Sequence, residues 1–366
     1  MKILYLANHL NIGGISSYIF TLSKGMKKKG HVCFVASGPG ELTPKLCREG
    51  VNYIPVPTDT KAEISLNVAV SFFKLRRKLR EHNIDIMHAS TRVTQVLACL
   101  LKRSTGIPYI STCHGFFKNR ITRRIFPCWG DKVIAISEQV REHLMQDFSL
   151  PPGNIRMIHN GIDLDKFVMP PKEHINIQKN KLGLGSGPVI GIMARLSDVK
   201  GHVYLIKAME TVLAQFPATQ LLIVGEGKIK GRLAGLSQKL GISKQVAFVP
   251  NILDTVDALC VMDIFVLPSL KEGLGLSLME AMALGRAVIG SNIGGIKTLI
   301  ADNISGLLVE PKTVSPLADA IIKLLRDPVK RQVYGSNAKV FIRENFSEEK
   351  MVLETERLYS ECVKQD

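Results

Sequence analysis

Residues 2–37 read KILYLANHLNIGGISSYIFTLSKGMKKKGHVCFVAS. The stretch begins and ends with apolar runs, Lys2–Leu6 and His31–Ser37, which predict two short β-strands. Gly30 is placed to end the segment between them as a helix C-cap would. Apolar residues of that segment fall on one helical face, at Ile15, Ile19, Leu22 and Met26. A strand, a helix and a strand in this order predict a parallel βαβ unit.

The same alternation continues along the chain and lapses once, in a polar segment with prolines and glycines at 166–188. Strands that are apolar throughout are typical of a parallel sheet covered on both faces. We therefore predict an α/β protein with two doubly wound, Rossmann-like domains at 1–165 and 189–345, a linker at 166–188 and a C-terminal helix at 346–366. The other predicted strands are Val51–Val56, Ile84–Ala89, Pro108–Cys113, Lys132–Ser137, Arg156–His159, Val189–Ala194, Gln220–Gly225, Val246–Pro250, Ile264–Pro268, Ala287–Ser291 and Leu307–Val309.

Composition excludes several classes of protein. Seven scattered cysteines without a C-x-x-C pair argue against a disulfide framework and against a zinc site. No run approaches the roughly 18 apolar residues of a membrane-spanning helix, and we expect a cytoplasmic protein. Lys and Arg exceed Asp and Glu by 24 − 12 = 12 in residues 1–166 and by 24 − 20 = 4 in the remainder. The excess positive charge of the first half favours an anionic partner.

The segment 263–285, DIFVLPSLKEGLGLSLMEAMALG, carries the clearest chemical signal. A strand ends at Pro268, a glycine loop follows, and a helix runs from about Ser277 to Leu284. Glycines let backbone amides approach a ligand, and a helix N-terminus attracts anions, so the loop suits a diphosphate. Glu280 then lies about one turn inside the helix, within reach of ribose hydroxyls, and Glu272 on the loop can face a sugar hydroxyl. The alternative interpretation makes Glu272 a solvated loop charge and Glu280 a carboxylate that favours the helix dipole.

These residues resemble the E-x7-E motif of glycosyltransferase family 4, the retaining nucleotide-sugar glycosyltransferases with the GT-B fold. Other segments agree with the family in the right order across the chain. They are Gly13-Gly14, Thr112-Cys113-His114-Gly115, Asn160-Gly161-Ile162-Asp163 with Phe167, Arg195-Leu196 with Lys200-Gly201, Val224-Gly225-Glu226-Gly227 and Ser305-Gly306-Leu307-Leu308-Val309.

The resemblance implies two domains facing across a cleft and a role for each matching residue. His114 and Glu272 are the implied catalytic residues, and His114 is expected to contact the donor sugar. The implied donor-binding residues are Gly14, Arg195, Lys200, Gly225, Gly273, Leu274, Gly275, Leu276 and Glu280. Arg195 and Lys200 would stabilise the leaving diphosphate in place of a metal ion. We therefore expect no cofactor and no metal, with the nucleotide-diphosphate sugar as donor substrate.

Three further patterns bear on metal binding, dinucleotide binding and sugar specificity. Asp163-Leu164-Asp165 spells D-x-D, but it falls in the hinge segment, and we do not assign it to a metal. Gly225, Gly227 and Gly231 do not form G-x-G-x-x-G, so the dinucleotide fingerprint is absent. Departures from the family pattern bear on the sugar and the base rather than on the fold: Leu274 in place of a frequent aromatic, Ser277 in place of Pro, and Lys297-Thr298 in place of Pro-Glu.

The sequence thus predicts a retaining hexosyltransferase that acts on a glycan or lipid-linked acceptor in cell-envelope polysaccharide or lipopolysaccharide synthesis. A nucleotide-sugar epimerase or hydrolase on the same fold is the alternative within enzymes. A basic nucleic-acid-binding protein is the alternative from another class, although no reading module is present; we expect no nucleic-acid partner.

Aromatic and basic residues are interleaved after His114, which is typical of an interfacial segment. We expect peripheral association with anionic membrane at the cytoplasmic face of the inner membrane; a core-packed helix with a wet basic face is the other interpretation. The segment contains Phe116, Phe117, Lys118, Arg120, Ile121, Arg123, Arg124, Ile125, Phe126 and Trp129.

Overall fold

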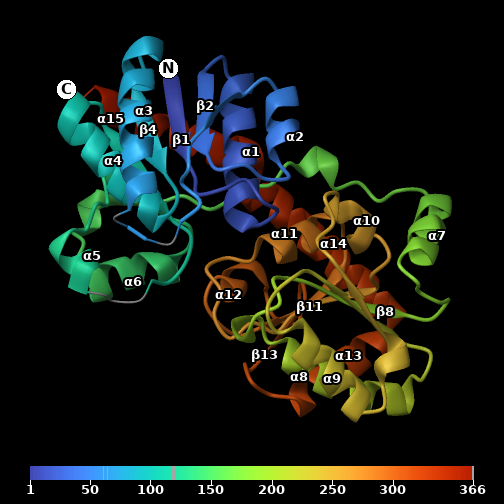
Figure 1. Cartoon of the computed structure of the whole chain (residues 1–366). Helices are drawn as coiled ribbons and strands as arrows, with labels where there is room; N and C mark the ends of the chain where they lie inside the picture. The colour runs from blue at the N-terminus through green and yellow to red at the C-terminus, as the bar shows by residue number, and fades with distance from the viewer. Residues whose placement is uncertain (61, 64, 118–120, 365–366) are drawn as a thin grey trace. The chain divides into compact units, whose positions relative to one another are not determined.

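The computed structural model describes residues 1–60, 62–63, 65–117 and 121–364. The chain forms two compact units (Figure 1). The first contains Met1–Gly161 together with the C-terminal segment Glu348–Asp366, and the second contains Ile162–Ser347. The predicted linker at 166–188 falls within the second unit and includes a helix, α7 (Lys172–Lys181).

The first unit is built on a parallel sheet with strand order β3-β2-β1-β4-β5-β6-β7. Each strand begins and ends within three residues of the apolar run that predicted it. The strands are β1 (Lys2–Leu6), β2 (Val32–Ser37), β3 (Asn52–Pro55), β4 (Ile86–Ala89), β5 (Tyr109–Cys113), β6 (Lys132–Ala135) and β7 (Ile155–Met157). The helices are α1 (Gly14–Lys28), α2 (Thr43–Arg48), α3 (Leu66–His82), α4 (Arg92–Thr105), α5 (Ile121–Ile125), α6 (Glu138–Phe148) and α15 (Glu348–Val363).

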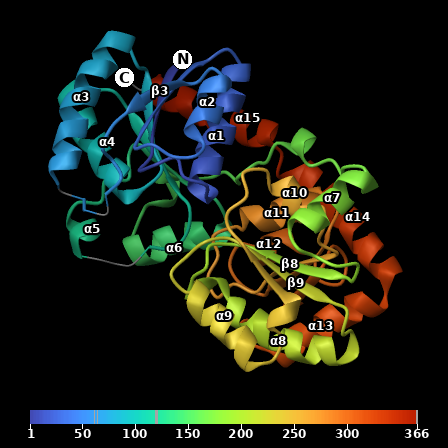
Figure 2. The same cartoon turned by 45° about the vertical axis from the view of Figure 1, so that its right-hand side comes forward.

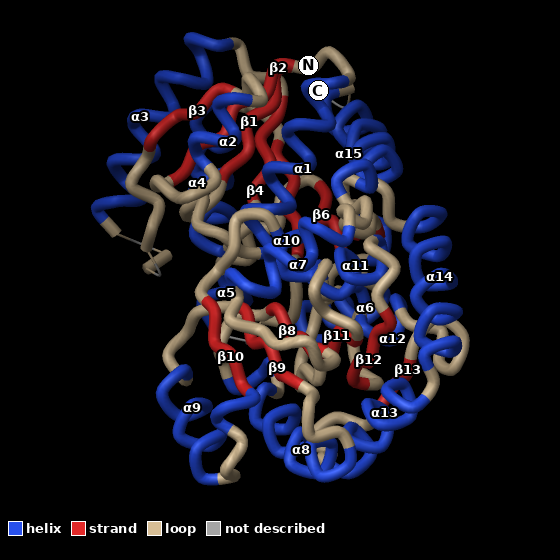
Figure 3. Tube along the Cα trace, turned by 90° about the vertical axis from the view of Figure 1, so that its right-hand side faces the viewer, coloured by secondary structure: helices blue, strands red, loops and turns tan. Residues whose placement is uncertain are grey.

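Both faces of this sheet are covered, as the apolar strands predict. Side chains alternate along β1, so that Ile3 and Tyr5 join a core with α1, whereas Leu4 and Leu6 join a separate core with α3 and α4. Figure 3 shows the strands in red between helices on both sides.

The last helix returns to the first unit, and in Figure 1 the red α15 lies among the blue elements of the N-terminal half. The sequence predicted this helix but not its packing partner. Its buried residues Met351, Val352 and Tyr359 join the core around α1. A Cβ on Gly25 of α1 would lie 2.4 Å from Val352 Cγ2, so the glycine permits this close approach.

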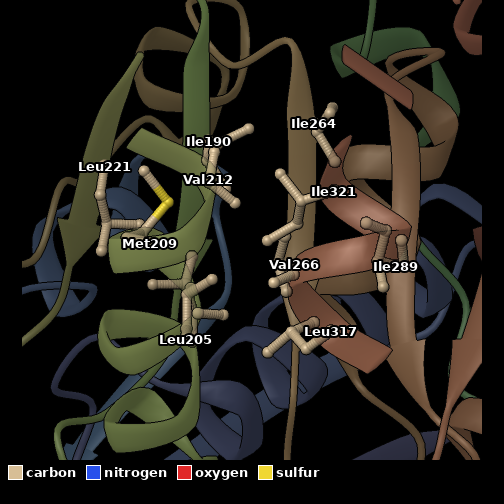
Figure 4. Packing of buried hydrophobic residues seen from close by; sticks show 14 of the residues in the cluster. Ile190, Leu205, Met209, Val212, Leu221, Ile264, Val266, Ile289, Leu317 and Ile321 are labelled. Carbon is tan, nitrogen blue, oxygen red and sulfur yellow. The ribbon is translucent and has the colours of Figure 1, made fainter. Parts of the chain in front are cut away.

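The second unit has a parallel sheet with strand order β10-β9-β8-β11-β12-β13. Its strands are β8 (Val189–Met193), β9 (Gln220–Val224), β10 (Val246–Val249), β11 (Ile264–Leu267), β12 (Ala287–Ser291) and β13 (Leu307–Val309). Figure 4 shows α8 and α13 packing their apolar faces on this sheet. Together with α7, the helices are α8 (His202–Gln215), α9 (Lys230–Lys239), α10 (Thr255–Leu259), α11 (Leu276–Ala283), α12 (Ile296–Leu299), α13 (Ser315–Arg326) and α14 (Pro328–Asn345).

Both units are therefore parallel doubly wound sheets, and the predicted fold class is confirmed. Within the described part of the chain, no helix combines the length and hydrophobicity needed to cross a membrane.

Candidate functional site

The glycine loop between β11 and α11 is held by a second glycine turn. Gly275 precedes α11 with a φ of 98°, a left-handed conformation that favours glycine. Gly295 donates its amide to the carbonyl of Glu272 over 3.2 Å. A Cβ on Gly295 would lie 2.2 Å from the oxygen of Gly273, and one on Gly294 would lie 2.3 Å from the oxygen of Glu272. Sequence reasoning missed this support, although the Gly294-Gly295 pair was the signal for it.

The beginning of α11 is available to an anion. No side chain caps this helix, and its first turn contains no acidic residue. The first amides of a helix lack intrahelical partners and carry the positive end of its dipole. Leu274 is 1% exposed, so this predicted donor-binding residue can offer its backbone but not its side chain. Leu276, the first residue of the helix, is half-buried.

A Lys–Glu ion pair joins two of the predicted donor-site residues. Lys200 Nζ contacts Glu272 Oε2, and Ser269 Oγ donates to the same oxygen over 3.3 Å. The side chains of Lys200 and Glu272 are 21% and 13% exposed. A hydrogen bond also joins the two loops that carry them, because the amide of Leu270 donates to the carbonyl oxygen of Val199 over 2.7 Å. The cation expected at the diphosphate and the carboxylate expected at the sugar thus lie side by side.

Arg195 and Gly225 occupy the neighbouring strand ends. Arg195 follows β8 and is exposed, so its guanidinium is accessible to a ligand. Gly225 follows β9 with a φ of 144°, and a Cβ there would lie 2.2 Å from the oxygen of Ala194. Gly225 therefore lets the β9 turn pack against the loop that carries Arg195.

Glu280 lies on α11 in a different setting from Glu272. Burial raises the pKa of the Glu280 carboxyl to about 7, while Lys166 and a hydrogen bond with Thr255 act in the opposite direction. Lys166 Nζ also lies 3.2 Å from Asp254 Oδ1 and 3.5 Å from Thr255 Oγ1. Sequence reasoning identified Glu280 but not these three neighbours, which come from distant parts of the chain.

Gly14 and His114 belong to the first unit, where both follow strands at the carboxyl edge of its sheet. Gly14 is the exposed first residue of α1. His114 is half-buried, and its ring meets Tyr18 edge-on with centroids 4.7 Å apart. Burial lowers the pKa of His114 to about 3, so the imidazole is neutral at physiological pH. Its Nε2 is buried without a hydrogen-bond partner among the described residues.

A buried polar network lies behind His114. Thr112 Oγ1 is 3.1 Å from the hydroxyl of Tyr18 and 2.7 Å from Nε2 of His88. His88 Nδ1 is 2.6 Å from the hydroxyl of Tyr359 on α15. The final helix of the chain thus completes the polar support beneath the strand end that carries His114.

Burial decides the roles of two groups near His114. Cys113 is buried with its thiol 3.1 Å from the oxygen of Gly115, and burial raises its pKa to about 12, as expected for a structural cysteine rather than a nucleophile. The prediction of an interfacial segment is wrong for Arg123 and Trp129, which are 5% and 8% exposed. Arg123 lies over aromatic rings instead of facing water.

The remaining described residues of that segment differ in exposure. Ile125 is 78% exposed, whereas Phe116 and Phe117 are half-buried. Lys118 and Arg120 lie outside the described residues, as do the side chains of Ile121 and Arg124. The D-x-D pair, Asp163 and Asp165, belongs to the short helical turn region at Leu164–Lys166, and no group of three metal-binding side chains occurs among the residues that the structure describes.

Two parallel α/β units, with a glycine loop and paired charges at the strand ends of the second, agree with the two-domain glycosyltransferase class that the sequence resembles. Residues 12–166 match the family described as Glycosyltransferase Family 4, and residues 174–341 match the one described as Glycosyl transferases group 1. The chain belongs to glycosyltransferase family 4.

Relatives span nearly the whole chain. An uncharacterized glycosyltransferase of Methanocaldococcus jannaschii is 26% identical over 95% of this chain and 94% of its own length. The UDP-Gal:alpha-D-GlcNAc-diphosphoundecaprenol alpha-1,3-galactosyltransferase of Escherichia coli is 27% identical, over 87% of this chain and 83% of that protein. A GDP-mannose-dependent monoacylated alpha-(1-6)-phosphatidylinositol monomannoside mannosyltransferase of Corynebacterium glutamicum is 27% identical, over 93% of this chain and 92% of that protein.

Solved structures share the fold. HepE of Anabaena, crystallised with UDP and glucose, superimposes with a TM-score of 0.88 at 21% identity, over 99% of this chain and 100% of that one. WaaG, a glycosyltransferase involved in lipopolysaccharide biosynthesis, gives a TM-score of 0.77 at 17% identity, over 98% of this chain and 99% of that one. These likenesses agree with the GT-B fold class.

Proposed function

We propose that this glycosyltransferase is a retaining enzyme, which moves a hexose-type sugar from a nucleotide-diphosphate donor to a glycan or lipid-linked acceptor in cell-envelope polysaccharide or lipopolysaccharide synthesis. The ion pair of Lys200 and Glu272 beside the uncapped start of α11 carries the proposal. A cation, a carboxylate and free helix amides match the chemistry of a sugar diphosphate, which has an anionic diphosphate and sugar hydroxyl groups. Relatives named for UDP-galactose and GDP-mannose support a nucleotide-sugar donor.

In the proposed reaction, the acceptor oxygen bonds to the anomeric carbon as the bond from that carbon to the diphosphate oxygen breaks. The leaving diphosphate takes the proton of the acceptor hydroxyl, so no enzyme nucleophile is required. Lys200, Arg195 and the α11 amides stabilise the charge that develops on the diphosphate. We propose that these groups act without a divalent metal.

Glu272 is proposed to accept a hydrogen bond from a hydroxyl of the transferring sugar. In the free enzyme its charge is balanced by Lys200. A bound diphosphate competes for Lys200 and releases a Glu272 oxygen toward the sugar. Glu280, which lies further along α11, is proposed to bind the ribose. In the first unit, His114 is proposed to contact the donor sugar and Gly14 to take part in donor binding.

The test is a panel of UDP-, GDP- and ADP-sugars incubated with candidate acceptors, followed by proton NMR of the product. An anomeric proton coupling that matches the donor supports a retaining transferase, whereas the opposite anomer contradicts it. Free sugar released at the same rate without any acceptor would favour the hydrolase alternative, and an altered donor sugar would favour an epimerase.

We also propose peripheral association of the first unit with anionic membrane. The positive excess of residues 1–166 and the exposed Ile125 support it. Because Arg123 is buried, the test neutralises Arg120 and Arg124 together and measures co-sedimentation with anionic vesicles at low salt. The control neutralises Lys230 and Lys239, two exposed lysines of α9. Equal binding of both double variants would contradict the proposal.

A further inference from the structure

The first unit contains a pocket of about 610 Å³ whose walls come from the loop after α5, the start of β6 and the end of α6. Figure 2 shows α5 and α6 next to each other in this unit. Trp129 and Gly130 precede β6, and Asn154 precedes β7, so this wall lies at the amino ends of those strands. His114 follows the carboxyl end of β5 instead. Most of the pocket lining therefore lies at the sheet edge opposite to the one that carries His114.

Arg123 lines this pocket as a buried cation. Its guanidinium carbon lies 4.0 Å from the ring centre of Phe117, 4.8 Å from that of Trp129 and 5.8 Å from that of Phe148. The residue is 5% exposed, and its Nη1 is buried without a hydrogen-bond partner among the residues that the structure describes. Aromatic faces stabilise the flat sides of a guanidinium but leave its N–H groups unpaired.

No carboxylate in the described part of the chain forms an ion pair with Arg123. The nearby Glu63 is bound to Arg92 over 3.0 Å, and Asp147, which also lines the pocket, is 2.5 Å from His143. Burial, together with the nearby positive charge of Arg92, lowers the pKa of Arg123 to about 10. At neutral pH the guanidinium is therefore charged, and burying an unpaired charge is costly.

The rest of the pocket suits an apolar group. Trp129, Phe148, Leu150 and Pro151 contribute apolar surface to its walls. Its volume lies in the range of roughly 300–1,000 Å³ that is typical of small-molecule sites. A ligand that fits has a negatively charged end for Arg123 and an apolar body for these side chains.

We propose that this pocket binds an amphiphilic oxyanion, a phosphate or carboxylate group attached to an apolar body, with Arg123 pairing with the anion and Trp129 and Phe148 contacting the apolar part. This site is additional to the donor site and does not depend on the proposed reaction. The same chemistry occurs in a soluble phosphorylated metabolite and in the headgroup region of an anionic lipid, and the two sources are separated below.

The pocket provides its own reporter, because Trp129 is the one tryptophan of the sequence. Octyl phosphate, titrated below its micelle concentration, is expected to change the tryptophan fluorescence saturably. Octanol has the apolar body without the anion, and inorganic phosphate has the anion without the body; both are expected to bind at least tenfold more weakly. Octyl phosphate that gives no saturable change, or that binds no better than octanol, overturns the proposal.

Arg123→Gln is expected to weaken octyl phosphate binding roughly tenfold to a hundredfold, the loss expected for a charged hydrogen bond. The matched control is Arg103→Gln, because Arg103 lies over Phe126 at 5.2 Å and does not line the pocket. If Arg123→Gln fails to fold, Arg123→Lys is used instead. It retains the positive charge but lacks the planar set of guanidinium N–H donors, and it is expected to bind octyl phosphate more weakly than the wild type does. Unchanged affinity in the folded Arg123 variant overturns the proposal.

Vesicles of phosphatidic acid in phosphatidylcholine identify the source of the ligand. A fluorescence change on these vesicles that requires Arg123 and is absent on pure phosphatidylcholine indicates a membrane lipid. Saturable binding of octyl phosphate without a vesicle response indicates a soluble metabolite. Either result supports the pocket, and a response to neither probe overturns it.

Discussion

Replacing Glu280 with glutamine is expected to stabilise the second unit at alkaline pH while weakening nucleotide binding. Burial raises the pKa of this carboxyl from 4.5 to about 7. When the pKa in the folded state exceeds that in the unfolded state, the group's contribution to stability is complete below about 4.5 and is lost as pH rises through about 7. Glutamine resembles the protonated carboxyl but does not titrate, so the variant lacks this loss.

The difference between the two pKa values sets the magnitude. At roughly 1.4 kcal/mol per pH unit, the ionised carboxyl costs up to about 3 kcal/mol of unfolding free energy at pH 8. A domain of this size shifts its melting midpoint by roughly 2–4 °C per kcal/mol. Glu280→Gln is therefore expected to melt near the wild-type temperature at pH 4.5 and as much as about 6–12 °C higher at pH 8.

Differential scanning fluorimetry at several pH values is the assay. Glu210→Gln is the control, because Glu210 is an exposed carboxylate of α8 in the same unit. Calorimetric titration of a nucleoside diphosphate at pH 8 is expected to show roughly tenfold to a hundredfold weaker binding to Glu280→Gln. A midpoint difference that is constant with pH would refute the buried, high-pKa carboxyl, and unchanged nucleotide affinity would refute its assignment to the ribose.

Three other outcomes follow from the same contacts. EDTA should leave transferase activity intact; loss of activity that Mg²⁺ or Mn²⁺ restores would contradict the assignment of Arg195 and Lys200. Glu272→Gln should lower turnover roughly tenfold to a hundredfold without weakening nucleoside diphosphate binding, since it frees Lys200; calorimetry and steady-state rates test this. Gly25→Ala should lower the unfolding free energy by about 1–3 kcal/mol, because the added methyl group overpacks against α15. Gly235→Ala on α9, where the methyl group meets open space, should raise it by about 0.5–1 kcal/mol. Denaturant titrations measure both changes.

The sheets were predictable because each strand is a short apolar run followed by a helical pattern. Helix α7 was not predicted, because its sequence KEHINIQKNK has no apolar face and Gln178 is its buried residue. The available signal was Pro171 immediately before it, a residue that favours a helix start. The partner of α15 was beyond prediction because packing between α1 and α15 joins opposite ends of the chain.

The sequence was enough to predict which residues belong to the candidate site, but not which of their side chains contact one another. The Lys200–Glu272 contact joins residues 72 positions apart, and no local pattern specifies it. The Glu280 neighbours Lys166 and Thr255 come together in the same way. Arg123 was misplaced because interleaved aromatic and basic residues are typical of an interfacial segment with exposed cations, whereas three aromatic rings surround the guanidinium in the structure.

The central claim is that the second unit binds the diphosphate of the donor through Lys200 and the start of α11. Calorimetric titration of UDP, GDP and ADP in the presence of EDTA tests it most directly. At least one of these nucleotides is expected to bind the wild type, and Lys200→Ala is expected to bind it at least about tenfold more weakly. Lys207→Ala, at an exposed position of α8, is expected to retain wild-type affinity. Failure of all three nucleotides to bind without metal, or equal affinity for wild type and Lys200→Ala, would contradict the account.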